Sequence, residues 1–245
     1  MTGPHARTVV RRDHAVIAPE THVPGPVPGW SGSEHVRLIS PAMGAGFSMS
    51  LVAMPAGAGA GPPPDGAGRF AYVLEGALAL EADAGPRILG AGGYAYIPPG
   101  TAHSLTASAA ARVCVIDKPY VPVPGAPHGR LIVGEAADRP PEPMLGDPAL
   151  TVRQLLPEEP ALDLAVNLMA FAPGAALPFV ETHVMEHGLL VLEGTLVYRF
   201  ADHWYPLGAG DAVWMGPFCP QWCCAYGPGR AEYLIYKDWN REAGA

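Results

Sequence analysis

The chain has 245 residues, a formal net charge of −8 and 49% hydrophobic residues. This composition excludes a disordered chain, and the absence of a basic patch argues against a nucleic-acid binder. There is no run of about 18 apolar residues, so no membrane span is expected. The start, "MTGPHARTVVRRDHAV", lacks the apolar segment of a secretory signal. We therefore expect a cytoplasmic globular protein that binds neither nucleic acid nor membrane.

Turn-forming residues are abundant, with 30 glycines and 29 prolines that follow no period. Many turns and few helix-length amphipathic stretches predict an all-β fold. The four cysteines form a poor disulfide framework at this length; they are Cys114, Cys219, Cys223 and Cys224. The stretch "CPQWCC" lacks the second paired cluster of a zinc site, so we expect small buried apolar residues in a reducing compartment.

In chain order, the first half reads "FAYVLEGALALEADAGPRILGAGGYAYIPPGTAHSLTA" from residue 70, which predicts about four short strands. The second half reads "GLLVLEGTLVYRFADHWYPLGAGDAVWMGPF" from residue 188, with strands and turns in the same order. Apart from His103, the histidines outside the second half, such as His14, lie in loop-like sequence. Each half alone predicts a small antiparallel barrel or jelly roll.

The two halves share an internal repeat. "VLEGAL" at 73–78 recurs as "VLEGTL" at 191–196, and "LGAG" at 89–92 recurs at 207–210, so both offsets are 118. Two matches at one offset indicate a tandem duplication of one β module. The Pro- and acid-rich stretch at 134–150 marks the join. We expect an N-terminal module over 1–140 and a C-terminal module over 141–245.

The segment "FVETHVMEHGLLVLEG" contains two histidines four residues apart, His183 and His187. This is also the spacing of a metal-binding helix, but on a helix Glu181 would point away from both rings. On a strand all three side chains share one face. We therefore expect a strand, or a strand pair, that carries three metal ligands on one side. Glu186 would alternate to the other side, where a solvated carboxylate is expected.

These motifs resemble the two conserved motifs of the cupin family. The first half carries the second motif nearly intact, from Gly92 through Pro98 and Gly100 to His103. The second half carries the first motif with its ligands permuted, with Glu181, His183 and His187 at the ligand places. The 118-residue offset places Gln221 where His103 stands, which completes a set of four ligands. The resemblance implies two cupin barrels in tandem, that is, an all-β bicupin.

The same offset carries the three ligands onto Pro63, Asp65 and Arg69 in the first half. Proline offers no side-chain donor and an arginine cannot deprotonate. We therefore expect no metal in the first module, which would serve packing or assembly. In the second module, two imidazoles, one carboxylate and one amide favour a harder divalent ion, manganese, over zinc or copper.

The permuted ligand set on a tandem cupin resembles the (S)-ureidoglycine aminohydrolase family, as do "YVPVPG" and the ending "YLIYKDWNRE". That family releases ammonia from ureidoglycine, a small anionic substrate, to give ureidoglycolate in purine (allantoin) degradation. The resemblance implies one Mn²⁺ per chain and a homo-oligomer. It implies the following residues: Glu181, His183, His187 and Gln221 as metal ligands; Glu181, Gln221, Tyr233, Lys237 and Tyr198 at the substrate; and Glu181, Tyr233 and Lys237 in catalysis.

Two other functions stay open on the sequence. Another metal-dependent cupin enzyme, a dioxygenase or isomerase, could act on a small organic acid, although a dioxygenase more usually keeps ligands suited to redox-active iron. A non-catalytic binding module is the second alternative, because fold does not fix function. The complete ligand set argues against the second alternative.

Overall fold

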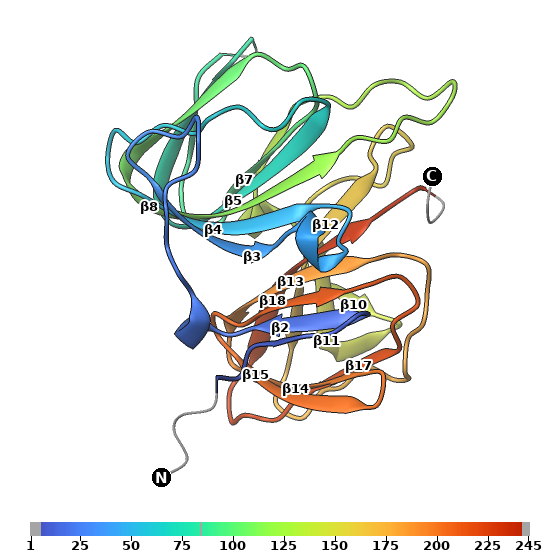
Figure 1. The fold of residues 1–245 in the computed structure, drawn as a ribbon. Coiled ribbons are helices and arrows are strands. Elements are labelled where there is room, and N and C mark those ends of the chain that lie inside the picture. The colour runs from blue at the N-terminus through green and yellow to red at the C-terminus, as the bar shows by residue number, and fades with distance from the viewer. Residues whose placement is uncertain (1–5, 84, 242–245) are drawn as a thin grey trace.

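A computed structural model describes residues 6–83 and 85–241, and this part of the chain is built almost wholly of antiparallel strands. Two β units lie one above the other, as Figure 1 shows. Short 3-10 turns interrupt the strands: η1 (Pro19–Thr21), η2 (Pro41–Met43) and η3 (Ala136–Asp138). In the described residues no helix is long and apolar enough to cross a membrane. The predicted all-β tandem architecture is confirmed.

The upper unit is formed by the first half of the chain as one sheet in the order β3-β4-β8-β5-β7-β9, with β6 paired to β5. Long strands β5 and β8 bend around this barrel and pair over most of their length. The strands are β3 (Glu34–Ile39), β4 (Ser48–Met54), β5 (Ala67–Ala82), β6 (Arg87–Leu89), β7 (Gly93–Ile97), β8 (His103–Pro119) and β9 (Ile132–Glu135).

The lower unit is formed by the second half as an eight-stranded sheet, β1-β2-β16-β13-β18-β12-β11-β10, facing a three-stranded sheet, β15-β14-β17. Its own strands are β10 (Glu142–Met144), β11 (Asp147–Gln154), β12 (Leu164–Phe171), β13 (His187–Glu193), β14 (Thr195–Phe200), β15 (His203–Gly208), β16 (Ala212–Met215), β17 (Gln221–Ala225) and β18 (Ala231–Asp238). The sheets change over between β9 and β10, next to the predicted join.

The N-terminal strands β1 (Val9–Val10) and β2 (His14–Ile17) belong to the lower unit, although the sequence placed them in a module over 1–140. Strand β2 pairs with β16, and Figure 1 shows the blue strand among the orange and red ones. This pairing covers what would otherwise be an open edge of β16. His14, expected in loop-like sequence, therefore lies in a strand. The boundary at 140/141 stays a prediction for the rest of the chain.

Among the described residues, three hydrophobic clusters stabilise the two units. One fills the first barrel around Val52, Val73 and Leu105, and one fills the second around Leu189, Phe200 and Tyr233. The third contains buried residues of both halves and lies between the units. Phe47 and Tyr236 pack against each other across it, with tilted rings whose centroids are 4.1 Å apart. Side chains alternate between the two faces of each strand, so both faces of the central sheets are buried. One face lies inside a barrel, and the other face packs against the other unit.

The internal repeat has a structural basis in two glycine positions. Gly76 and Gly194, again 118 residues apart, both have positive φ (76° and 74°). The strand register shifts at Gly76 in the first half and between Val191 and Glu193, just before Gly194, in the second. At each glycine a Cβ would collide with a backbone oxygen, Ala110 O or Arg230 O. Only glycine tolerates both the left-handed backbone and the close approach. The "LEG" signature is therefore a bulge that both barrels require.

Gly194→Ala is expected to destabilise the protein by about 2–4 kcal/mol, because the strained backbone adds to the collision with Arg230 O. The free energy of unfolding, measured by urea denaturation, checks this. Gly208→Ala is the matched control, since Gly208 has no atom within 4 Å of the added Cβ and should change stability little. Equal stability of both variants would contradict the bulge assignment.

Candidate metal centre

His183, His187 and Gln221 converge inside the second barrel. The side-chain nitrogen of Gln221 lies 3.2 Å from His183 Nε2 and 3.2 Å from His187 Nδ1. The two imidazole rings have centroids 4.8 Å apart. Turning the amide by 180° exchanges its nitrogen for Oε1 at the same place, so three donor atoms can face one point.

Different sheets position these side chains. His187 is the first residue of β13, where it pairs with Met215 of β16 and Lys237 of β18. Gln221 begins β17 in the three-stranded sheet, and Glu181 pairs with it through two backbone hydrogen bonds, Glu181 N to Gln221 O (2.8 Å) and Gln221 N to Glu181 O (2.9 Å). The centre is thus held where the two sheets of the barrel meet.

Of the expected strand or strand pair over Glu181, His183 and His187, the structure shows two separate pairings and no continuous strand. Glu181 forms an isolated bridge, His183 lies in a connection, and only His187 begins a strand. Glu181 pairs in one sheet and His187 in the other, so the residues between them must cross from sheet to sheet. The crossing is fixed by a hydrogen bond from Phe218 N to His183 O, 2.8 Å. The three side chains still reach one cavity.

A cavity of about 240 Å³ in the second barrel is lined by all seven residues that the sequence singled out. They are Glu181, His183, His187, Tyr198, Gln221, Tyr233 and Lys237. The sequence reasoning missed an apolar wall that includes Met144, Met169, Met185 and Trp239. Trp239 could have been predicted from the sequence, because it follows Lys237 by two residues and, in an extended chain, lies on the same face. Its ring lies under the Lys237 ammonium, 5.0 Å from Nζ.

Burial dominates the electrostatics of this cavity. Burial lowers the pKa of His187 to about 3, and burial together with the nearby Lys237 lowers the pKa of His183. Both rings are therefore neutral at physiological pH, with lone pairs free to bind a cation. Burial raises the pKa of Glu181, whereas Lys237 opposes this rise.

The two ring nitrogens next to the Gln221 amide, His183 Nε2 and His187 Nδ1, could turn their lone pairs toward one bound cation. The opposite nitrogens, His183 Nδ1 and His187 Nε2, would then carry the protons. Among the described residues these two nitrogens are buried without a hydrogen-bond partner. Two imidazoles, one amide and one carboxylate at the same cavity fit a divalent cation. Glu181, His183, His187 and Gln221 are thus a chemically consistent ligand set.

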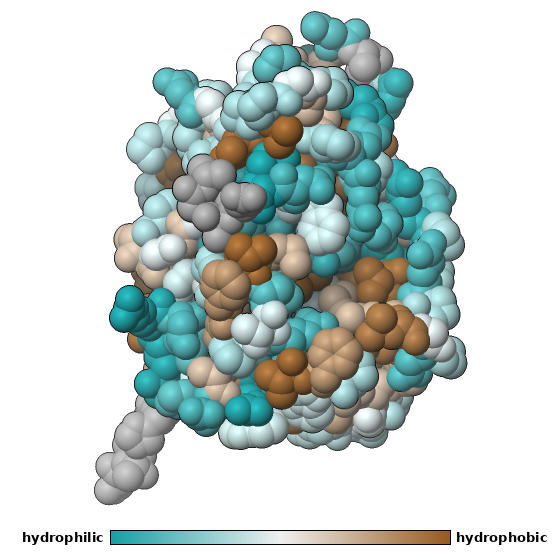
Figure 2. Space-filling model, turned by 90° about the vertical axis from the view of Figure 1, so that its right-hand side faces the viewer, coloured by the Kyte–Doolittle hydropathy of each residue, from teal (hydrophilic) through white to brown (hydrophobic). Residues whose placement is uncertain are grey.

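Apolar side chains border the segment that carries the ligands. Phe179 and Val180, 55% and 42% exposed, directly precede Glu181, and Phe218, 59% exposed, is hydrogen-bonded through its backbone to His183. On the face shown in Figure 2, brown side chains gather over the lower unit, between teal polar surfaces. Exposed apolar side chains therefore flank the segment that carries the candidate ligands.

Comparison with known proteins identifies the family. A cupin-domain model matches residues 50–117. The chain is 42% identical to the (S)-ureidoglycine aminohydrolase of Arabidopsis thaliana over 238 residues, which covers 96% of this chain and 78% of that protein. The chain belongs to the (S)-ureidoglycine aminohydrolase family. The aminohydrolase of Escherichia coli K12 is 32% identical and is covered to 92%. The solved structure of protein Ylba from E. coli superposes with a TM-score of 0.85 at 29% identity, covering 98% of this chain and 97% of that one.

In this family member, the equivalent place in the first barrel is filled by an ion pair. Arg69 stands where the repeat would put His187, and it is 1% exposed. Its guanidinium donates to both carboxylate oxygens of Asp117, at 2.7 and 3.0 Å, and lies over the Trp30 ring at 5.0 Å. A fixed cation at this place repels a metal ion. The geometry supports the prediction that the first module holds no metal.

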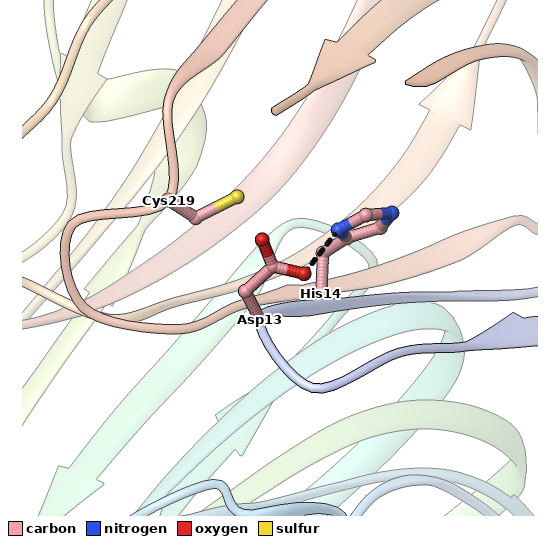
Figure 3. Close-up of side chains that lie close together, drawn as sticks. All are labelled: Asp13, His14 and Cys219. Carbon is pink, nitrogen blue, oxygen red and sulfur yellow. Dashed lines mark hydrogen bonds and ion pairs between the residues drawn. The ribbon is translucent and has the colours of Figure 1, made fainter. Parts of the chain in front are cut away.

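A second cluster of ligand-type side chains, Asp13, His14 and Cys219, lies two strands from His187, because His14 and His187 pair with the same residue of β16, Met215 (Figure 3). Both nitrogens of His14 already have partners, Asp13 Oδ1 at 2.9 Å and Tyr205 OH at 2.9 Å. Burial raises the pKa of Cys219 to about 11, which keeps it a thiol. The satisfied imidazole and the protonated sulfur indicate a structural cluster that anchors β2.

Proposed function

We propose that the chain is a manganese-dependent hydrolase that releases ammonia from (S)-ureidoglycine to give (S)-ureidoglycolate. The observation that carries the proposal is the single cavity that holds every residue implied by the family resemblance. Identity of 42% over nearly the whole chain to a named aminohydrolase supports the reaction class. The donor set of nitrogen and oxygen atoms supports a hard divalent ion such as manganese.

The reaction replaces one substituent at a single carbon. Ureidoglycine carries a carboxylate, an amine and a ureido nitrogen on that carbon; water adds a C–O bond, the C–N bond to the amine breaks, and ammonia leaves. Bound to Glu181, His183, His187 and Gln221, a manganese ion would supply positive charge that holds an anionic substrate and makes bound water more acidic. The remaining work falls to the side chains of the cavity.

Lys237 is the cation that would bind the substrate carboxylate. It points into the same cavity as Glu181, and burial lowers its pKa while Glu181 opposes that effect. Glu181 would take a proton from the attacking water and give one to the departing amine. In the metal-free cavity, burial raises the pKa of Glu181, which makes its carboxylate a stronger base than an exposed one.

Tyrosines would orient the substrate. Tyr233 is buried, and its hydroxyl donates to Met169 Sδ at 3.4 Å. The hydroxyl oxygens of Tyr233 and Tyr198 are also 3.4 Å apart. A thioether is a weak acceptor, so this hydrogen bond can be given up cheaply for a substrate oxygen. Burial raises the pKa of both tyrosines, which keeps them neutral donors.

Gln221→His is expected to keep the metal site while lowering activity. An imidazole restores a nitrogen donor, so metal binding should persist and become less selective for manganese over zinc. Activity should fall at least about tenfold, because the amide is expected to contact the substrate as well. Competitive titration with Mn²⁺ and Zn²⁺, followed by an ammonia assay of the manganese-loaded variant, checks both parts. Full activity would show that the amide has no role beyond binding metal.

The proposed reaction is tested with metal-loaded protein and freshly prepared ureidoglycine. Ammonia and the chirality of the product are followed while dissolved oxygen is recorded. Stoichiometric ammonia and one ureidoglycolate enantiomer, without oxygen uptake, are expected. Oxygen consumption would identify a dioxygenase instead, and binding without turnover would identify a binding module.

A further inference from the structure

Glu186, next to the ligand His187, is buried at the boundary between the two units. The sequence predicted a solvated carboxylate, which is wrong, because Glu186 is 7% exposed. Its side chain points away from His187 and towards the first half of the chain. There Gly46 N donates to both carboxylate oxygens, Oε1 at 2.9 Å and Oε2 at 3.1 Å.

The second half of the chain completes the coordination of this carboxylate. Trp214 Nε1, on the strand beside β13, donates to Oε2 at 3.2 Å. The backbone of Glu186 is clamped as well: its N–H donates to Asp238 Oδ1 at 2.6 Å, and Asp238 N donates to Glu186 O at 3.3 Å. Asp238 directly follows Lys237. One residue therefore ties the connection ending at His187 to the strand that carries Lys237.

The first module is shaped to receive this residue. A Cβ on Gly46 would lie 2.6 Å from Glu186 Oε1, so the glycine makes room for the carboxylate. The next residue, Phe47, fills the space above Gly188, where a Cβ would lie 2.5 Å from Phe47 Cζ. The segment Gly46–Phe47 thus contacts the two residues on either side of His187. Packed and hydrogen-bonded neighbours of this kind fix the orientation of a metal ligand.

We propose that Glu186 is a positioning residue through which the first module holds His187 and Lys237 in their working geometry. The proposal rests on the proposed function of the second-module site and goes beyond it, because it assigns the first module a part in that site. The first barrel, in which an ion pair occupies the equivalent place, then contributes through the contact at Gly46.

Glu186→Gln tests the proposal with a nearly isosteric change. An amide oxygen at the Oε2 place could still accept from Trp214 Nε1 and Gly46 N, but the NH₂ group would then stand at the Oε1 place, which lies 2.9 Å from Gly46 N, with donor against donor. The Mn²⁺ dissociation constant is expected to rise about 10–100-fold, and kcat at saturating manganese should fall with KM little changed. Glu193→Gln is the matched control, an exposed glutamate at the far end of β13, and should change neither quantity.

Gly46→Ala tests the same contact from the other module, without altering any residue of the metal-bearing half. It should raise the Mn²⁺ dissociation constant, as Glu186→Gln does. A folded form of either variant with the parent's manganese affinity and kcat, within twofold, would overturn the proposal, even if its melting temperature were lower. The metal titration needs no substrate, so a parent that binds manganese but releases no ammonia would refute the proposed function alone.

Discussion

Lys237→Met is expected to weaken substrate binding by about 2–4 kcal/mol, roughly 30–1,000-fold in kcat/KM. Methionine keeps the length of the side chain over the Trp239 ring but removes the cation that would meet the substrate carboxylate. Burial lowers the pKa of the Lys237 ammonium, which shows that its charge is unfavourable in the empty cavity. The variant should therefore be at least as stable as the parent. Steady-state ammonia release and thermal unfolding of the variant measure the two effects.

The other lysine of the chain provides the contrast. Lys118 is buried in an ion pair with Asp163, Nζ to Oδ2 at 2.5 Å, outside the candidate centre. Lys118→Met leaves Asp163, 1% exposed, without its cation and should cost about 3–5 kcal/mol of stability. Lys237→Met should thus lower activity without loss of stability, whereas Lys118→Met should lower stability. Wild-type turnover by Lys237→Met would place the substrate elsewhere.

His187→Leu is expected to abolish metal binding at micromolar concentrations, a loss of more than about 100-fold in affinity. Leucine keeps the volume inside the barrel but offers no donor, and the removed ring is one of the two that face Gln221. The matched change is His103→Leu in the first module, where His103 Nδ1 donates to Thr101 O at 2.8 Å. This control should bind metal as the parent does. Metal lost in the control but kept in His187→Leu would reverse the assignment of the modules.

The sequence predicted the repeat well because the repeat has strict backbone requirements. Gly76 and Gly194 mark the same bulge, and Gly92 and Gly210 both donate their N–H to the valine that begins the "VLEG" stretch, at 2.8 Å in each half. Such positions tolerate little substitution, so they stay visible in one sequence. The 118-residue offset of the repeat also maps His103 onto Gln221. Gln221 has no motif of its own, yet the structure places it at the cavity, as this offset predicted.

The sequence failed where pairing between distant segments decides the structure. Alternation correctly put Glu186 on the opposite side from His187, but nothing local shows that Gly46 of the other half covers that side. The N-terminal strand β2 likewise looked like loop because its partner, β16, lies about 200 residues further on. The crossing at His183 follows from the assembly of two sheets, which no period in the segment reveals.

The most direct measurement is a titration of metal-free protein with Mn²⁺ in which ammonia release from ureidoglycine and bound metal are recorded together. Activity should rise in proportion to bound manganese and reach its plateau at one ion per chain, because the ligand set that we propose belongs to the second module alone. Full ammonia release by the metal-free protein, or a plateau at two ions per chain, would contradict this account.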